Sequence, residues 1–465
     1  MTPARSYPSQ GAWSPCEAIG LAATLGVALY TSGVFALYLC GLSGGDAAFL
    51  ALPPALCVLL LGGRALRTAR RGEAAPDGGG PRAAIVAGSL VMVAQVAFAA
   101  YGAVRAPFGS WDAWSFWALK ARMFAAGGPL PGYFHDPVTV YTHPDYPLNL
   151  PLAEALFLRL PGALGVTLAA SIGPACLAAL LLLLYAGLTR LHGPTTAALA
   201  TGALSFVPAL AAQAAGGDAD VPLAMYAGGS ALYLLLWWRL RRPADALLMG
   251  LLAGGALWTK KEGLPVAALL LTAYLTREAL RAAGPSGGHT VSSREKGACA
   301  AWGPLGVLAT SAVFPLPWLL FCRAVRPLGR DFLPLTPSVF LAHIDRLPHI
   351  LALFALQTLD FANWSLLWVL LAVALPLAAR RFPPPGRGLL LLLLGQIGVY
   401  ALSFVFSDWQ PYTAHVQTSL DRLLVQATPL ALLLLVESIH ALGAIGGRRA
   451  LAEERAGLLT HEAAA

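Results

Sequence analysis

Long apolar runs constrain what this chain can fold into more than any other feature of its sequence. The chain contains many Leu-, Ala- and Val-rich segments, and segments of about 20 apolar residues match a bilayer hydrocarbon core about 30 Å thick. Of the 465 residues, 57% are hydrophobic and 12% are charged, which is about half the charged fraction of a soluble domain. We therefore expect an all-α, polytopic membrane protein.

The apolar segments predict about twelve transmembrane helices. They are placed at 17–41, 46–63, 83–104, 164–190, 195–214, 221–238, 244–258, 263–276, 300–322, 350–379, 388–406 and 422–443. The chain then divides into N-terminal helices with an extra hairpin (1–104), a first large outer loop (105–163), a transmembrane core (164–445) and a cytoplasmic tail (446–465). Gly-, Pro- and Ser-rich linkers at 72–82, 284–297 and 380–388 are expected to be mobile.

Basic residues set the expected orientation. With the N-terminus inside, 20 of the 31 Lys and Arg residues fall in inner segments, although the longest loop lies outside. The positive-inside rule thus favours both termini in the cytoplasm, with the site on the outer side. We expect a multi-pass protein of the plasma membrane, the inner membrane of a bacterium. The net charge of +8 has the same topological origin. Because the basic residues are scattered in short loops, no nucleic-acid partner is expected.

The outer loop from Trp111 to Pro151 gathers titratable and aromatic side chains. At helical spacing, one face carries Ala113, Trp114, Trp117, Ala121 and Phe124, and the other carries Asp112, Ser115, Leu119 and Arg122. This pattern predicts an amphipathic helix on the membrane surface, begun by Gly109-Ser110, with Trp at headgroup depth. Asp112 is the first catalytic candidate. The alternative is that Asp112 only favours the helix N-terminus electrostatically.

Two His-Asp groups follow in the same loop. His135-Asp136 and His143-x-Asp145 carry donors suited to a divalent metal or to sugar hydroxyls. The alternative is a hydrogen-bonded loop core braced by prolines. A divalent metal is therefore a candidate cofactor, without an assigned set of ligands. Asp145 is the second catalytic candidate, and the candidate substrate contacts of this loop are Trp111, Lys120, Arg122 and His143.

Three later segments add candidate substrate contacts at the outer ends of predicted spans: Asp218 and Asp220, then Lys260, Lys261 and Glu262, and finally Arg422. Asp220 stands two residues before Pro222, so its alternative role is to cap the next helix. Outer cations oppose the positive-inside rule. An anionic lipid phosphate explains them, and so does snorkelling to the lipid headgroups.

These landmarks together resemble the GT-C superfamily of membrane glycosyltransferases, which includes the protein O-mannosyltransferases and the lipid A aminoarabinose transferases. Asp112 in WDAW matches the acid of the family's first large outer loop, and DADVPL at 218–223 matches its acid-Pro-Leu element. KKEG at 260–263 matches a Lys-x-x-Gly-like turn, and Arg422 matches a late arginine. Two features depart from the family: many relatives carry paired acids at WDAW, and fewer spans usually precede residue 105.

The resemblance implies an enzyme that moves a sugar from a polyprenyl-phosphate carrier to an acceptor, which is a lipid, a glycan or a protein. Transfer would occur at the outer face with inversion, and Asp112 would act as the general base. Lys260, Lys261 and Arg422 would hold the phosphate, and grooves between spans would hold the prenyl tail, so membrane lipids are partners. The competing class is a transporter or flippase, but transporters place ionisable groups near the membrane midplane. The oligomeric state is not predicted.

Overall fold

The computed structural model describes residues 13–69, 82–128, 132–283, 303–379 and 382–462. Within these ranges the chain is helical, and its one extended pairing is an isolated bridge between Phe332 and Ser407. The expected all-α, polytopic architecture is confirmed. The predicted linkers at 72–82 and 284–297 lie almost entirely outside the described residues.

The helices follow one another along the whole chain. The first part contains α1 (Pro15–Leu39), α2 (Gly44–Ala69), α3 (Arg82–Arg105), the π-helical turn η1 (Ala113–Trp117), α4 (Ala118–Ala125), η2 (Val140–Thr142), α5 (Asn149–Leu158), α6 (Gly162–Ala170), α7 (Ile172–His192), α8 (Pro194–Leu204) and α9 (Pro208–Gly216). The second part contains α10 (Asp220–Leu240), α11 (Pro243–Thr259), α12 (Gly263–Ala283), α14 (Pro304–Ala312), α15 (Leu316–Val325), α16 (Pro337–His343), η3 (Ile344–Arg346), α17 (Leu347–Thr358), α18 (Phe361–Trp364), α19 (Leu367–Ala379), α20 (Pro384–Val405) and α21 (Tyr412–Glu462).

Among the described residues, 7 helices are long and apolar enough to cross a membrane, or up to 9 if each bent pair is one span. The pairs are α8 with α9, bent by 66°, and α14 with α15, bent by 65°. The predicted single span 350–379 is wrong, because the structure divides it into α17, α18 and α19. The Asp360 carboxylate accepts a hydrogen bond from the Ala362 amide at 3.0 Å, which starts α18 as a separate helix.

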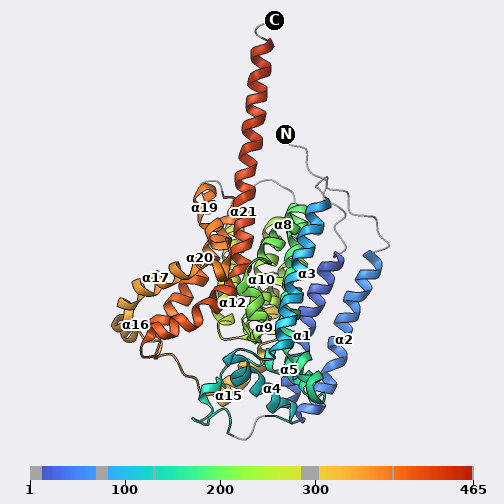
Figure 1. Ribbon diagram of the computed structural model, residues 1–465, viewed down its shortest axis with the longest axis vertical. Helices are drawn as coiled ribbons and strands as arrows, with labels where there is room; N and C mark the ends of the chain where they lie inside the picture. The colour runs from blue at the N-terminus through green and yellow to red at the C-terminus, as the bar shows by residue number, and fades with distance from the viewer. Residues whose placement is uncertain (1–12, 70–81, 129–131, 284–302, 380–381, 463–465) are drawn as a thin grey trace.

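Helix α10 lies in the middle of the bundle and packs on α7, α11 and α21 (Figure 1). Nearly all of its side chains are buried. Small residues allow this close packing, as in other membrane helices. At Gly228, a Cβ atom would lie 2.4 Å from Pro429 Cβ, so this glycine permits the contact between α10 and α21. This central helix begins at the polar end of the bundle, where the candidate site lies.

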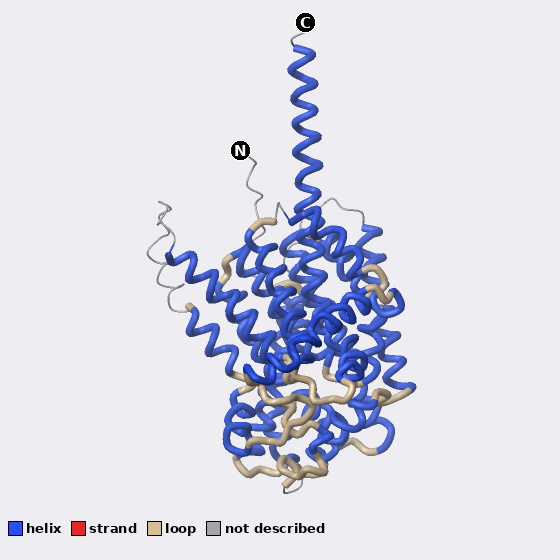
Figure 2. Tube along the Cα trace, turned by 90° about the vertical axis from the view of Figure 1, so that its left-hand side faces the viewer, coloured by secondary structure: helices blue, strands red, loops and turns tan. Residues whose placement is uncertain are grey.

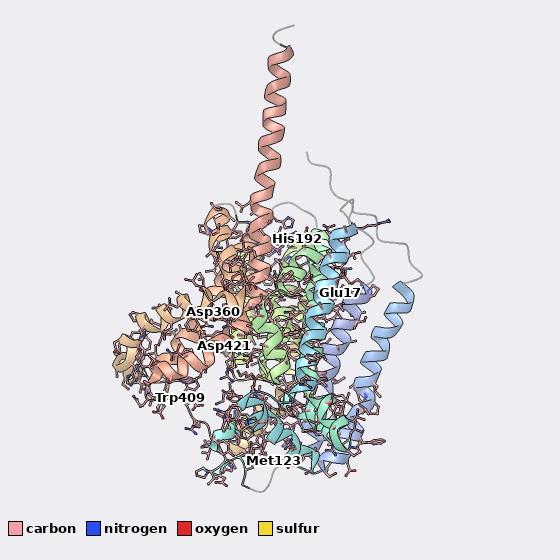
Figure 3. All side chains as sticks on the ribbon, viewed as in Figure 1. Glu17, Met123, His192, Asp360, Trp409 and Asp421 are labelled. Atoms are coloured by element: carbon pink, nitrogen blue, oxygen red, sulfur yellow. The ribbon has the colours of Figure 1, made fainter. Side chains whose placement is uncertain are left out.

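The two ends of the bundle differ. Helices α4, α5 and α15 gather at one end together with most of the irregular segments, and α21 extends from the other end (Figures 1 and 2). Glu17 and His192 lie at the end from which α21 extends, and Met123 lies at the loop end (Figure 3). Near Glu17, Arg190 forms ion pairs with Glu17 at 2.7 Å and with Asp245 at 2.8 Å. These paired charges join α1, α7 and α11.

The predicted surface helix exists, but its apolar face packs against the protein and not against the membrane. Ala113, Trp117, Ala121 and Phe124 are at most 2% exposed. Trp114, which the helical spacing places on the same face, is instead 52% exposed. Its position follows from the π-helical turn η1, which changes the angular spacing of residues 113–117 from the α-helical value. The expectation of a Trp-bearing face at headgroup depth is therefore wrong for Trp117.

Candidate functional site

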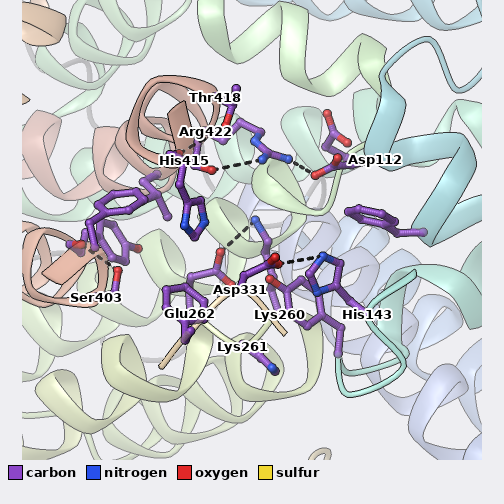
Figure 4. A pocket seen from close by; sticks show the side chains of 18 of the residues that line it. Asp112, His143, Lys260, Lys261, Glu262, Asp331, Ser403, His415, Thr418 and Arg422 are labelled. Carbon is purple, nitrogen blue, oxygen red and sulfur yellow. Dashed lines mark hydrogen bonds and ion pairs between the residues drawn. The ribbon is translucent and has the colours of Figure 1, made fainter. Parts of the chain in front are cut away.

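A cavity of 1150 Å³ that is lined by both charged and apolar side chains lies at the loop end of the bundle (Figure 4). The start of η1, the turn before α12, the segment before α16 and the first turns of α21 form its walls. The predicted site residues that line it are Trp111, Asp112, His143, Asp218, Lys260, Lys261, Glu262 and Arg422. Segments far apart in the sequence therefore meet in one chamber.

Asp112 forms an ion pair with Arg422 across the cavity (Figure 4). Ser110 fixes the start of the helix that carries Asp112, because its Oγ accepts a hydrogen bond from the Ala113 amide at 3.0 Å. The same hydroxyl donates to Asp218 Oδ1 at 2.6 Å. The side chains of Asp112 and Arg422 are 22% and 21% exposed. An oriented carboxylate and a guanidinium thus face the same space.

Asp220 and Lys260 form a buried ion pair beside this space. Lys260 Nζ donates to Asp220 Oδ1 at 2.8 Å and lies 3.0 Å from Glu262 Oε1. Gln426 Nε2 donates to the same Asp220 oxygen at 2.5 Å. The alternative of Asp220 as a helix cap is wrong, since Ala219 is the N-cap residue. The turn between α11 and α12 ends at Gly263. A glycine is needed there, because a Cβ atom would lie 1.9 Å from the Ala256 carbonyl oxygen.

Asp218 is a second carboxylate in the cavity wall, only 3% exposed. Burial, reinforced by the Asp220 carboxylate, raises the pKa of Asp218 to about 7. The protonation of the Asp218 carboxyl group therefore changes near neutral pH. Its hydrogen bond with Ser110 couples that change to the helix start beside Asp112.

Asp145 is paired with Lys261 and lies behind the residues that line the cavity. Burial raises the pKa of the Asp145 carboxyl, and the positive charge of Lys261 opposes this shift. The segment before α16 covers it closely, since a Cβ at Gly329 would lie 2.2 Å from Asp145 Oδ2. Of the two catalytic candidates, only Asp112 lines the cavity.

His143 joins the loop between α4 and α5 to the segment before α16. Its Nε2 lies 3.3 Å from Asp331 Oδ2, and Trp409 Nε1 donates to Asp331 Oδ1 at 2.9 Å. The imidazole stacks on Tyr146 with the ring centres 4.6 Å apart. Burial, followed by the positive charge of Lys120, lowers the pKa of His143 to about 3, so the ring is neutral at physiological pH. Asp331 therefore holds three segments together around the cavity (Figure 4).

Other candidates of the first loop lie away from the cavity. Lys120 is fully buried and donates to the His143 carbonyl oxygen at 2.8 Å, and burial lowers the pKa of its ammonium to about 7. Arg122 and His135 are exposed and are not among the lining residues. Asp136 accepts from the Val138 amide at 2.8 Å in a local turn. Within the described ranges, no three His, Cys, Asp or Glu side chains are placed to hold a metal ion.

Several lining residues were not assigned to the site from the sequence: Gln213, Arg330, Asp331, Trp409, His415 and Asp421. Arg330, Asp331 and Trp409 come from short polar breaks between apolar segments, LGRDF at 328–332 and SDWQ at 407–410. A short polar segment between two apolar segments could have indicated that these residues belong to the site. Both segments are too short to contain a recognisable motif.

Residues 145–291 match the family model described as dolichyl-phosphate-mannose-protein mannosyltransferase. The matched segment includes Asp145, Asp218, Asp220, Lys260 and Lys261, whereas Asp112 and Arg422 lie outside it. The match supports a membrane glycosyltransferase of the GT-C superfamily, in agreement with the motifs. No curated protein and no solved structure matches the chain.

Proposed function

We propose that this membrane glycosyltransferase of the GT-C type moves a sugar from a polyprenyl-phosphate carrier to an acceptor hydroxyl at the outer face of the membrane. The observation that carries the proposal is the shared cavity, in which the Asp112 carboxylate stands with the cations Lys261, Arg330 and Arg422. A proton acceptor and fixed positive charges in one chamber are what such a transfer requires.

The proposed reaction is a single displacement. The acceptor oxygen attacks the anomeric carbon, and the bond from that carbon to the phosphate oxygen breaks with its electron pair on the phosphate. Asp112 takes the proton of the acceptor hydroxyl as the new glycosidic bond forms. Attack on the face opposite the leaving phosphate inverts the anomeric centre. The polyprenyl phosphate leaves with additional negative charge, which the cations of the cavity stabilise.

The cations differ in how freely they can meet a phosphate. The Lys260 side chain is 7% exposed and is held by Asp220 and Glu262. Lys261 and Arg330 have side chains that are 38% and 52% exposed, and both line the cavity. We therefore assign the phosphate contact to Lys261 and Arg330, with Arg422 on the Asp112 side. Lys260 would hold Asp220 and Glu262 in place.

The apolar part of the cavity suits the start of a prenyl chain. Pro265 of α12, Val399 and Phe404 of α20 and Leu423 of α21 line it. In this proposal residues 105–163 are an outer loop that supplies the base, and residues 164–445 form the core that binds the carrier. Residues 1–104 would be an added N-terminal element, and residues 446–465 a cytoplasmic tail.

The test uses the purified full-length protein in lipid nanodiscs. A panel of polyprenyl-phosphate hexoses and pentoses is compared with the matching nucleotide sugars, and release of polyprenyl phosphate or nucleotide is measured. We expect turnover with a polyprenyl-phosphate sugar, and its loss in Asp112→Asn. Turnover with nucleotide sugars alone would overturn the proposal, as would a complete lack of turnover with the polyprenyl-phosphate panel.

A further inference from the structure

Gln213 and Asp421 form a polar pair in the cavity wall that the proposed transfer does not use. Gln213 belongs to α9, the second arm of a bent helix pair, and Asp421 belongs to α21. Gln213 Nε2 donates to Asp421 Oδ2 at 3.4 Å, and both residues line the cavity. Gln213 Oε1 is buried and has no hydrogen-bond partner among the described residues.

This pair lies beside the proposed base. Asp421 precedes Arg422, whose guanidinium holds Asp112. Helix α9 ends at Gly216, whose carbonyl oxygen accepts a hydrogen bond from the Ser110 amide at 3.4 Å. Ser110 in turn starts the helix that carries Asp112. The elements that carry Gln213 and Asp421 are therefore both joined to the segment that carries Asp112.

The unpaired Gln213 Oε1 atom is a hydrogen-bond acceptor, so a ligand at this position must supply a donor. A buried amide oxygen without a partner is unfavourable, and a ligand that donates a hydrogen bond relieves that cost. A phosphate diester offers only acceptors, so this position does not suit the leaving group. A hydroxyl group is a donor and fits both Gln213 Oε1 and the Asp421 carboxylate. The pair is thus complementary to a hydroxyl-rich molecule bound on the Asp112 side.

An exposed aromatic ring also lines the cavity. Trp111 is 63% exposed, lines the cavity and contacts Trp114 edge-to-face, with the ring centres 4.6 Å apart. An indole face of this kind covers the apolar C–H face of a pyranose, while hydrogen-bonding side chains take its hydroxyls. Trp111 directly precedes Asp112, and both side chains line the cavity, so one ligand can contact the indole ring and the proposed base.

We infer that Gln213 and Asp421 form an acceptor subsite and that the acceptor is a carbohydrate, which presents one hydroxyl to Asp112 and a second one to Gln213. This inference rests on the proposed function and adds the class of acceptor to it. A serine or threonine hydroxyl would use its single proton at Asp112 and leave Gln213 Oε1 without a hydroxyl donor.

The test measures release of polyprenyl phosphate from the donor while acceptor probes are titrated: octyl glucoside, 1-octanol and a Ser/Thr-containing peptide. We expect octyl glucoside to accelerate release more than 1-octanol or the peptide does. Gln213→Met, which keeps the length but removes both polar atoms, should raise the half-maximal glucoside concentration about 2- to 12-fold, the effect of one uncharged hydrogen bond.

Two further variants keep this test decisive. Gln95→Met is the matched control, because Gln95 Oε1 is also buried without a partner but Gln95 lies outside the cavity. Its glucoside response should equal that of the wild type. Asp421→Asn changes the other member of the pair and should weaken the glucoside response in the same direction, even if Gln213→Met folds poorly.

Three outcomes would overturn the carbohydrate acceptor while leaving the proposed function intact. They are acceleration by the peptide but not by the glucoside, no acceleration of donor release by any probe, and an equal glucoside response in the wild type, Gln213→Met and Asp421→Asn. Failure of the proposed function looks different, because the wild type would then release no polyprenyl phosphate at all, even to water.

Discussion

The Asp112 carboxylate and the Arg422 guanidinium form an ion pair although 310 residues separate them in the sequence. The pair joins the start of η1 to the first turns of α21. The contact limits the rotation of the carboxylate, and a general base must be held in a defined orientation. Because both partners line the cavity, a carboxylate and a positive charge face the same space.

Asp112→Asn should remove the proton acceptor and keep the shape of the side chain. We expect transfer to fall by about 10²–10⁴-fold, the usual contribution of a general base. The measurement is the rate of polyprenyl phosphate release at saturating donor. Asp136→Asn is the matched control, because Asp136 lies in the same loop and its side chain serves only a local turn. Near-normal release by a well-folded Asp112→Asn protein would remove Asp112 from the mechanism.

Substitution of Lys260 should mainly lower stability, whereas substitution of Lys261 should mainly weaken donor binding. Lys260→Met leaves the Asp220 and Glu262 carboxylates without their buried cation, so we expect a loss of about 3–5 kcal/mol in stability. The Lys261 side chain is 38% exposed but its partner Asp145 is only 12% exposed, so Lys261→Met should cost more than the about 0–1 kcal/mol of a surface ion pair and less than Lys260→Met. Lys261→Met should instead weaken donor affinity by about 10–150-fold, the effect of one charge-assisted contact.

Thermal unfolding and the donor KM separate these two effects. The measurement is Tm in detergent by intrinsic fluorescence, together with the donor concentration at half-maximal release. A Lys261→Met protein with an unchanged donor KM would contradict the assignment of the phosphate contact. A Lys260→Met protein as stable as the wild type would contradict the structural role of the buried pair.

Asp218 should make stability depend on pH. Burial, with the nearby Asp220 carboxylate, raises the pKa of Asp218 from 3.8 to about 7. Between these values the folded protein binds more protons than the unfolded chain, so the free energy of unfolding falls as the pH rises. Asp218→Asn cannot ionise and still accepts the hydrogen bond of Ser110. From about pH 5 to about pH 7.5, the Tm of the wild type should therefore fall by more than that of the variant.

The comparison needs only the difference between the two Tm curves, because other titrating groups contribute equally to both. Parallel curves over this interval would show that the folded protein does not retain the Asp218 proton.

Cysteine labelling tests which side of the membrane the cavity faces. Val138 is 76% exposed at the loop end, and Ala244 is exposed at the other end, next to Asp245 of the Arg190 cluster. In a Cys40→Ser background, which removes an exposed native thiol, an impermeant maleimide should label Val138→Cys in intact cells. Ala244→Cys should react only after lysis. The reverse pattern would place the cavity inside. Ala244 is chosen because Ser286, in the predicted inner linker, lies outside the described residues.

The parts of the site that could be predicted are those with a charge in an unexpected place. Lys260 and Lys261 are basic residues at a predicted outer end, and Asp112 begins a predicted helix in the longest predicted outer loop. All three line or approach the cavity. Gln213 offered no such signal, because a neutral amide in an Ala-rich helix does not disturb the hydropathy pattern. Its role depends on the neighbour that folding supplies, Asp421.

The sequence by itself determined the class of the protein and the end of the bundle at which its polar groups gather. Hydropathy and charge act between each residue and the bilayer, so these features need no partner in the chain. Only the tertiary structure decided that Asp112 meets Arg422, that Lys260 is buried with Asp220, and that Trp117 packs inward. Those contacts depend on how remote helices pack against each other, which the residues next to each position in the sequence do not specify.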